Sequence, residues 1–240
     1  LGERFLKFAL GHNLEHVSET EVILRAMKNV SREEKMRHEL QDIVRRYYLS
    51  RVSEETPVIS DEMYMRLVSL SKFGSRLRGT VTRDRYKNDI MTSRPSAEIG
   101  SRLGKQIVKL AQSLALVRGK KEVTESELAV MRKAILDTIP QREEDLVRWL
   151  WKECPTIDDY RTTRQITVGT RYPHATTGRL LSDMHALQIV SRGGSHNSHE
   201  WTLTPYIRNC ITESGLYSKE ADPRKTLRVL FKKRKRRTAK

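Results

Sequence analysis

An apolar stripe over residues 103–117 is the pattern that most restricts the fold. Its members recur at steps of four and three residues, the spacing of one helix face: Leu103, Ile107, Leu110, Leu114 and Val117. Gly119 is expected to end this helix. A capping box of Thr124 and Glu127 then opens a second helix, which Pro140 ends. Two consecutive amphipathic helices predict a packed helical pair, and we expect a mainly α fold.

Helical periodicity also covers the residues before this pair. Ser18 is expected to cap a short helix that ends near Met27, and a Ser31–Glu34 capping box a longer one that ends near Arg51. Ser60 opens a third helix, which ends near Gly74.

Residues 79–93 break the helical period and predict a short β-hairpin. Its cations Arg83, Arg85 and Lys87 are candidates to contact nucleic acid. A solvated, exposed hairpin fits the same pattern equally well.

A different order of elements is predicted for residues 141–217. They are expected to form a helix over 141–153, a short helix over 163–170, a helix over 174–187 and strands over 189–192 and 200–204. Two helices joined by a turn and followed by a hairpin are the order of a winged helix-turn-helix domain. The sequence therefore predicts such a domain over residues 141–217.

The helix over 174–187 supplies the candidate DNA contacts of this domain. Its apolar residues Leu180, Leu181, Met184 and Leu187 define a buried face, and Arg179 lies among small residues on the opposite face. An arginine so placed can grip guanine in the major groove. The DNA-binding candidates of this domain are Arg171, His174, Thr177, Arg179, Ser182 and Arg192, and the wing also carries His196 and His199. The alternative is a module that binds protein.

The charge of the chain supports a polyanionic partner. There are 46 Lys and Arg residues against 30 Asp and Glu, a formal net charge of +16, and neutralising phosphates releases counterions. Residues 218–240 are expected to form a disordered basic tail. Its phosphate-binding candidates are Lys232, Lys233, Arg234, Lys235, Arg236 and Arg237. A localisation signal, or a basic protein of ribosomal type, fits the same composition.

Other classes of function receive little support from the sequence. No run approaches the roughly 18 consecutive apolar residues of a membrane span, so we expect no membrane partner and a cytoplasmic location. His12 and His16 are spaced four residues apart but have no third ligand nearby, so we expect no metal site.

Two stretches resemble AAA+ ATPases of the minichromosome-maintenance-like (helicase) branch, of the type found in phages and plasmids. LGERFLKFAL at residues 1–10, with Arg4 before Phe5, is similar to their arginine-finger segment, and residues 96–140 resemble their helical lid. The resemblance implies that residues 1–17 end an AAA+ core and residues 18–140 form a lid region. It assigns catalytic roles to Arg4, as the finger that acts on a neighbouring subunit, and to Arg102, as the lid's sensor arginine.

The same resemblance implies a ring-shaped homo-oligomer that uses ATP and magnesium in DNA unwinding or replication initiation, on a mobile element. Residues 100–106 are too short for a phosphate-binding loop and have Gln106 where a hydroxyl would hold magnesium. We therefore expect this chain to bind no ATP alone and to be the C-terminal part of such an enzyme. The alternative is a non-enzymatic, DNA-binding regulator with a helical dimerisation region and a winged helix.

Overall fold

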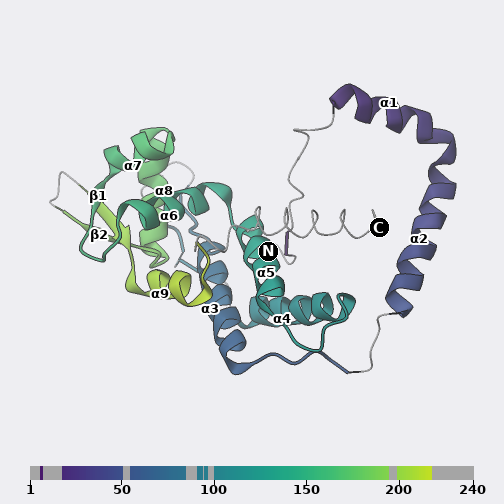
Figure 1. Cartoon of the computed structure of the whole chain (residues 1–240). Helices are drawn as coiled ribbons and strands as arrows, with labels where there is room; N and C mark the ends of the chain where they lie inside the picture. Colours follow the sequence, from purple (N-terminus) through teal and green to yellow (C-terminus); the bar gives the residue numbers. More distant parts are fainter. Residues whose placement is uncertain are drawn as a thin grey trace.

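The computed structural model describes residues 6–7, 18–50, 55–84, 91–93, 95–96, 100–194 and 199–217. Within these ranges the chain is mainly helical, as predicted, and has one small antiparallel sheet with strand order β1–β3–β2 (Figure 1). The elements are α1 (Glu19–Asn29), the 3₁₀ turn η2 (Val30–Arg32), α2 (Glu33–Leu49), α3 (Asp61–Leu77), α4 (Gly100–Val117), α5 (Glu125–Thr138), α6 (Gln141–Glu153), β1 (Arg161–Thr162), α7 (Thr163–Thr170), α8 (His174–Ala186), β2 (Val190–Gly193), β3 (Glu200–Leu203) and α9 (Pro205–Ser214).

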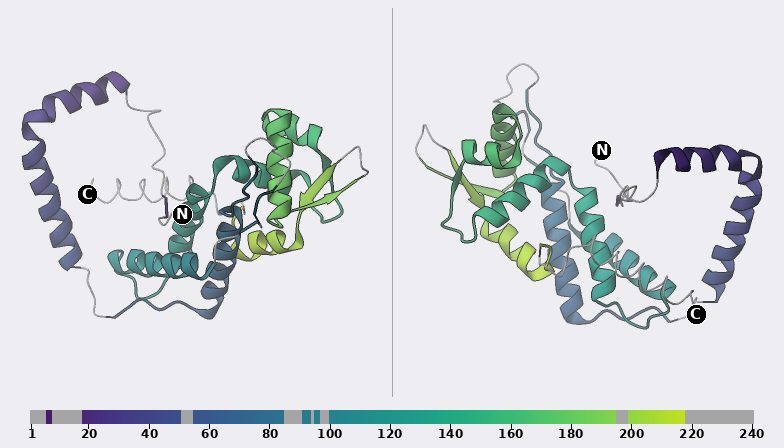
Figure 2. Two further views of the ribbon diagram at one scale, coloured as in Figure 1. Left: turned by 180° about the vertical axis from the view of Figure 1, so that it is seen from behind. Right: turned by 45° about the horizontal axis from the view of Figure 1, so that its top comes forward.

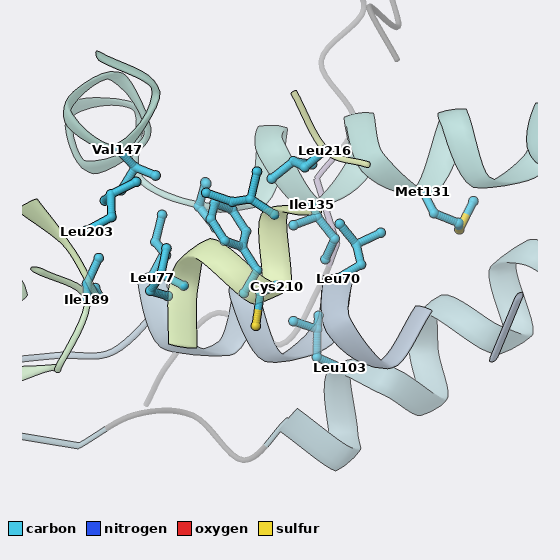
Figure 3. Packing of buried hydrophobic residues seen from close by; sticks show 14 of the residues in the cluster. Leu70, Leu77, Leu103, Met131, Ile135, Val147, Ile189, Leu203, Cys210 and Leu216 are labelled. Atoms are coloured by element: carbon cyan, nitrogen blue, oxygen red, sulfur yellow. The ribbon is translucent and has the colours of Figure 1, made fainter. Parts of the chain in front are cut away.

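Helices α3, α4, α5 and α9 pack together around a common core. The Ser60 side chain caps α3, accepting from the backbone N of Met63 at 3.3 Å, and the predicted Thr124–Glu127 capping box opens α5. Figure 3 shows Leu70, Ile135 and Leu216 meeting inside this bundle. The predicted pair of packed helices is confirmed, with Gly119 in the left-handed conformation (φ 69°) just after α4.

The buried face of α4 differs from the predicted stripe. Its buried residues are spaced four apart: Leu103, Ile107, Ala111 and Ala115. Leu110 is 37% exposed. The two alanines replace larger side chains at the contact, which allows the neighbouring helix to approach closely.

Two predicted helix boundaries are wrong. Ser31 does not cap a helix, because it lies inside the η2 turn, and the N-cap of α2 is Arg32 without a side-chain bond. Gly74 does not end α3, which continues to Leu77. Gly74 instead faces Leu103 of α4, whose Cδ2 atom would lie 2.9 Å from an added Cβ. This glycine therefore serves helix packing.

The predicted hairpin over residues 79–93 has no regular strand among its described residues. The chain runs antiparallel through isolated bridges, Thr80 with Ser96 and Arg83 with Met91. Arg85 and Lys87 lie outside the described residues. This segment turns toward α8, because Gly79 packs against Leu187, where an added Cβ would lie 2.6 Å from Cδ2.

Helices α6, α7 and α8 and the sheet form the second half of the body, and α9 joins it to the first. Helix α9 packs along α3 (Figure 1), and the buried Arg132 of α5 donates from Nε to the Ser214 carbonyl at 2.8 Å. Figure 3 shows Leu77 of α3 beside Ile189 and Leu203 of the sheet region. A continuous core therefore runs through residues 55–217, apart from the stretches outside the described residues.

Helices α1 and α2 form an arm that stands apart from this body in both views of Figure 2. No residue of α2 is buried, and the arm touches the body through the Tyr47 hydroxyl, which donates to the Val117 carbonyl at 3.0 Å. No helix in the described ranges has the length and apolar character of a membrane span.

Candidate nucleic-acid interface

Local sequence signals fix helix α7. Thr162 and Gln165 form a capping box at its start, and Trp201 Nε1 of β3 donates to Thr163 Oγ1 at 2.9 Å. Arg171 ends the helix in the left-handed conformation (φ 60°) and turns the chain into α8. The capping bonds and the tryptophan contact hold α7 against the sheet.

Two contacts attach α7 and the following turn to α6. Gly169 packs on the Trp149 ring, because an added Cβ would lie 2.1 Å from Nε1. The Tyr172 hydroxyl donates to Asp145 Oδ2 at 2.5 Å. This hydrogen bond, together with desolvation, raises the pKa of Tyr172 to about 12. The turn that presents α8 is thus held by α6, and the Tyr172 hydroxyl in it keeps its proton at neutral pH.

The N-terminal half of α8 presents an open cationic surface. His174, Ala175 and Arg179 are exposed there. Among the described residues, the Arg179 side chain makes no ion pair, although Asp183 lies one turn away. Asp183 is instead bound by Arg83, from Nε to Oδ1 at 2.7 Å. Because Arg83 occupies the nearest carboxylate, the charge of Arg179 stays available to an external anion.

Arg83 and Ser182, both predicted to contact DNA, bind each other in the structure. Arg83 Nη2 donates to Ser182 Oγ at 3.2 Å, and its side chain is 13% exposed. The segment of residues 79–84 therefore covers the C-terminal half of the outer face of α8. Only tertiary structure brings these two residues together, since they are far apart in sequence.

The prediction for Thr177 is wrong. Its side chain is fully buried, and Oγ1 donates to the Pro173 carbonyl at 3.1 Å. The residue points into the body and stabilises the first turn of α8. The next residue, Gly178, lies beside α7, because an added Cβ would be 4.0 Å from Thr163 Cγ2.

Three further arginines are exposed in the turn before α8 and on the elements α7 and β2 that contact it. Arg171 precedes it, and Arg192 is exposed on β2, where it pairs in register with Trp201. Arg164 is exposed in the first turn of α7, and its neighbour Thr163 faces α8. Arg164 was not predicted as a candidate contact, although its position two residues after the Thr162 cap was a usable signal.

The residues of the predicted wing are described in part. His199 packs edge-on against Trp201, with ring centroids 6.1 Å apart. Its ring therefore belongs to the packing of the sheet. His196 lies outside the described residues.

Several predicted site residues cannot be placed at this surface. Arg4 and the tail residues Lys232, Lys233, Arg234, Lys235, Arg236 and Arg237 lie outside the described residues. Arg102 is exposed in the first turn of α4, and the start of this helix packs on the second half of α3, where an added Cβ at Gly100 would lie 3.4 Å from Ser75 Oγ. Arg102 therefore lies on a different helix from the candidate DNA contacts of α8.

The residues that superficially suggest a phosphate loop do not fit ATP. Residues 100–106 are the first turns of α4, so they do not form the glycine-rich loop that a phosphate-binding motif places ahead of its helix. Within the described ranges, no group of three or more His, Cys, Asp or Glu side chains is placed to hold a metal ion.

The comparisons with known proteins leave the chain without a family assignment. No protein-family model matches it, and no curated protein or solved structure shows a significant match. The function of the chain is therefore inferred from the geometry of the surface around α8.

Proposed function

We propose that residues 141–217 form a winged helix-turn-helix domain that binds duplex DNA. The observation that carries the proposal is the open, cationic N-terminal half of α8, in which Arg179 is exposed while Asp183 is held by Arg83. A recognition helix of this class contacts base edges with its N-terminal residues, while flanking cations bind the backbone. The order of α7, α8, β2 and β3 supports the same proposal.

Each exposed cation has a role set by its chemistry. Arg179 lies beside Ala175 on the outer face of α8, so its guanidinium can donate two bonds to guanine O6 and N7 without obstruction. Arg171, Arg164 and Arg192 flank the helix and bind phosphates. His174 at the helix start donates to a phosphate or a first base. The affinity of such a surface falls steeply with salt.

The proposal is tested with Arg179→Ala and a matched variant, Arg45→Ala. Both remove one exposed arginine and leave the same net charge, but Arg45 lies on the arm. Fluorescence anisotropy with a labelled duplex is measured at about 50 mM and about 200 mM salt. We expect Arg179→Ala to weaken binding about tenfold, and Arg45→Ala to change it less than about twofold. Equal affinity of the two variants contradicts the proposal.

A second experiment tests the role of Arg83 as a positioning residue. Arg83→Ala frees Asp183, which then lies at the right spacing to pair with Arg179 on the same helix. We expect DNA affinity to fall about threefold to tenfold, by less than 1.4 kcal/mol. The double variant Arg83→Ala/Asp183→Asn removes the competing carboxylate and recovers most of the affinity. No recovery contradicts this role and leaves the main proposal standing.

The basic tail is proposed to add phosphate contacts without sequence preference. A chain that lacks residues 224–240 is expected to show a shallower dependence of affinity on salt, because fewer counterions are released. The anisotropy titrations above measure this slope. An unchanged slope excludes the tail from the complex.

A second candidate function is that of the lid and accessory part of an AAA+ ATPase that forms a ring. One observation favours it: the Lys7 backbone N donates to Thr138 Oγ1 at 2.8 Å, so the arginine-finger-like segment reaches the end of α5. A reading frame that continues ahead of Leu1 with Gly-x4-Gly-Lys-Ser/Thr supports this candidate, and Arg4→Ala and Arg102→Ala are then expected to lower ATPase activity. A stop codon directly ahead of Leu1 contradicts it and favours the regulator.

A further inference from the structure

Helix α2 carries an apolar stripe, and none of its residues is buried in the described part of the chain. Its residues recur at steps of four, three and four: Met36, Leu40, Ile43 and Tyr47. Leu40 is 62% exposed and Ile43 is 56% exposed. Exposed apolar residues that follow one helix face mark an interaction surface.

We propose that α2 pairs in antiparallel orientation with α2 of a second copy of this chain. The four stripe residues occupy the a and d positions of a coiled-coil heptad. In an antiparallel pair, Leu40 packs against Ile43 of the partner subunit, and Met36 packs against Tyr47 of the partner subunit. Symmetry repeats both contacts, so four apolar layers form along the pair.

Charge complementarity selects the second copy and the antiparallel direction. Glu39 and Arg46 lie on the same edge of the stripe, and both are exposed. In the antiparallel pair, Glu39 faces Arg46 of the partner subunit, and symmetry makes this ion pair twice. In a parallel pair, Arg32 would instead face Arg37 of the partner subunit, a like-charge contact that disfavours that arrangement.

The exposed area is sufficient for a weak dimer. The exposed fractions on α2 correspond to roughly 500 Å² of apolar surface per copy, and those on α1 add a similar area. Two copies together approach the 1,200–2,000 Å² or so of a standard interface. Because α2 alone supplies only about 1,000 Å² from two copies, below this range, we expect dissociation in the micromolar range. The hydrogen bond from Tyr47 to Val117 is a contact that the arm would rearrange.

The first test measures the mass of the full chain by sedimentation equilibrium from about 1 to about 200 µM. The chain is expected to pass from monomer to dimer over this range. Leu40→Asp/Ile43→Asp places charges in the apolar layers and is expected to keep the chain monomeric throughout. Both residues are exposed in a single copy, so an unchanged thermal unfolding temperature verifies that the body still folds.

The second test exchanges the charges and distinguishes the partner. Glu39→Arg and Arg46→Glu are each expected to weaken the dimer about tenfold, because each leaves like charges facing each other. When the two variants are mixed, opposite charges face each other again, and a heterodimer at least as strong as the original dimer is expected. Glu34→Arg and Arg45→Glu lie on the opposite face of α2 and are the matched controls, expected to leave dimerisation unchanged.

Three results overturn the proposal. The wild-type chain stays monomeric at the highest concentration, in which case another protein covers the stripe. The dimer persists in Leu40→Asp/Ile43→Asp, in which case a different surface forms it. The mixture of the charge variants associates no better than either variant alone, in which case the pairing is not antiparallel. None of these results depends on DNA binding, so the proposal fails or stands separately from the proposed function.

Discussion

Helices α2 and α4 have similar lengths and similar amphipathic patterns, but the apolar face of α4 is buried and that of α2 is exposed. Helix α4 buries Leu103, Ile107 and two alanines against α3 and α5, whereas no residue of α2 is buried. The difference teaches that an apolar stripe specifies a helix and a face, but not the surface that covers it. The small residues of α4 permit close packing inside the body, whereas the large residues of α2 remain exposed.

The largest expected difference between the two helices is in the cost of removing a leucine. Leu103→Ala leaves a cavity in the body and is expected to lower the free energy of unfolding by roughly 3 kcal/mol. Leu40→Ala, measured at a protein concentration too low for dimerisation, is expected to change it by less than about 0.5 kcal/mol. Chemical denaturation measures both. Similar costs for the two variants would show that the arm is packed in solution.

The next largest difference in stability between body and arm is expected when the charge of a buried glutamate, Glu127, is removed. Burial alone would raise the pKa of Glu127, but hydrogen bonds from Thr124, Lys120 and Arg118 outweigh it and lower the pKa to about 2. Lys120 Nζ lies 2.9 Å from Glu127 Oε2. Glu127→Gln is expected to cost roughly 2 kcal/mol at neutral pH, because two cations lose their partner. Glu34→Gln on the arm, where the carboxylate is exposed, is the matched control and is expected to be neutral.

The same lowered pKa predicts the direction of the pH dependence. The contribution of Glu127 is fully present above its ordinary pKa of 4.5 and is lost as the pH falls toward about 2, where the folded state also takes up the proton. Unfolding measured between these limits is expected to show the wild type approaching Glu127→Gln in stability. A gap between the two proteins that stays constant down to the lower limit contradicts the assignment.

Alanine substitutions at two glycines of the body are expected to give the smallest changes in the free energy of unfolding. The distance from the added Cβ to its neighbour decides whether each change is a loss or a gain. Gly169→Ala forces its Cβ against the Trp149 ring and is expected to cost about 1.5 kcal/mol. Gly178→Ala meets Thr163 at ordinary contact distance, so the better helix propensity of alanine is expected to stabilise by up to about 1 kcal/mol. Thermal unfolding of both variants is the measurement. The same sign for both would show that α6 and α7 are less tightly packed than the distance implies.

Element types were largely predictable from local signals. The Thr124–Glu127 box, Gly119 and Pro140 placed α4 and α5 correctly, because capping and chain breaking depend on residues a few positions apart. The Ser31–Glu34 prediction failed because the chain continues through a 3₁₀ turn, where no cap is needed. Gly74 was mistaken for a helix end because its role, close contact with α4, is not visible along the sequence.

The surface around α8 was predictable in part. Arg179 is exposed as the helical period implied, and Arg171, His174 and Arg192 are exposed beside it along the chain, but Thr177 points inward because the buried face is wider than its apolar residues alone suggested. The pairing of Arg83 with Asp183 joins residues that are far apart along the chain. No local pattern predicts such a pair.

The sequence by itself determined most of the helices, the hairpin of β2 and β3 and the surplus of positive charge, because each depends on spacing or composition. The tertiary structure decided which stripe is buried and which stays exposed. It also decided which arginines are bound inside the body and which remain open at α8. The physical reason is that burial and ion pairing depend on which surfaces meet in space, and here those surfaces come from distant segments of the chain.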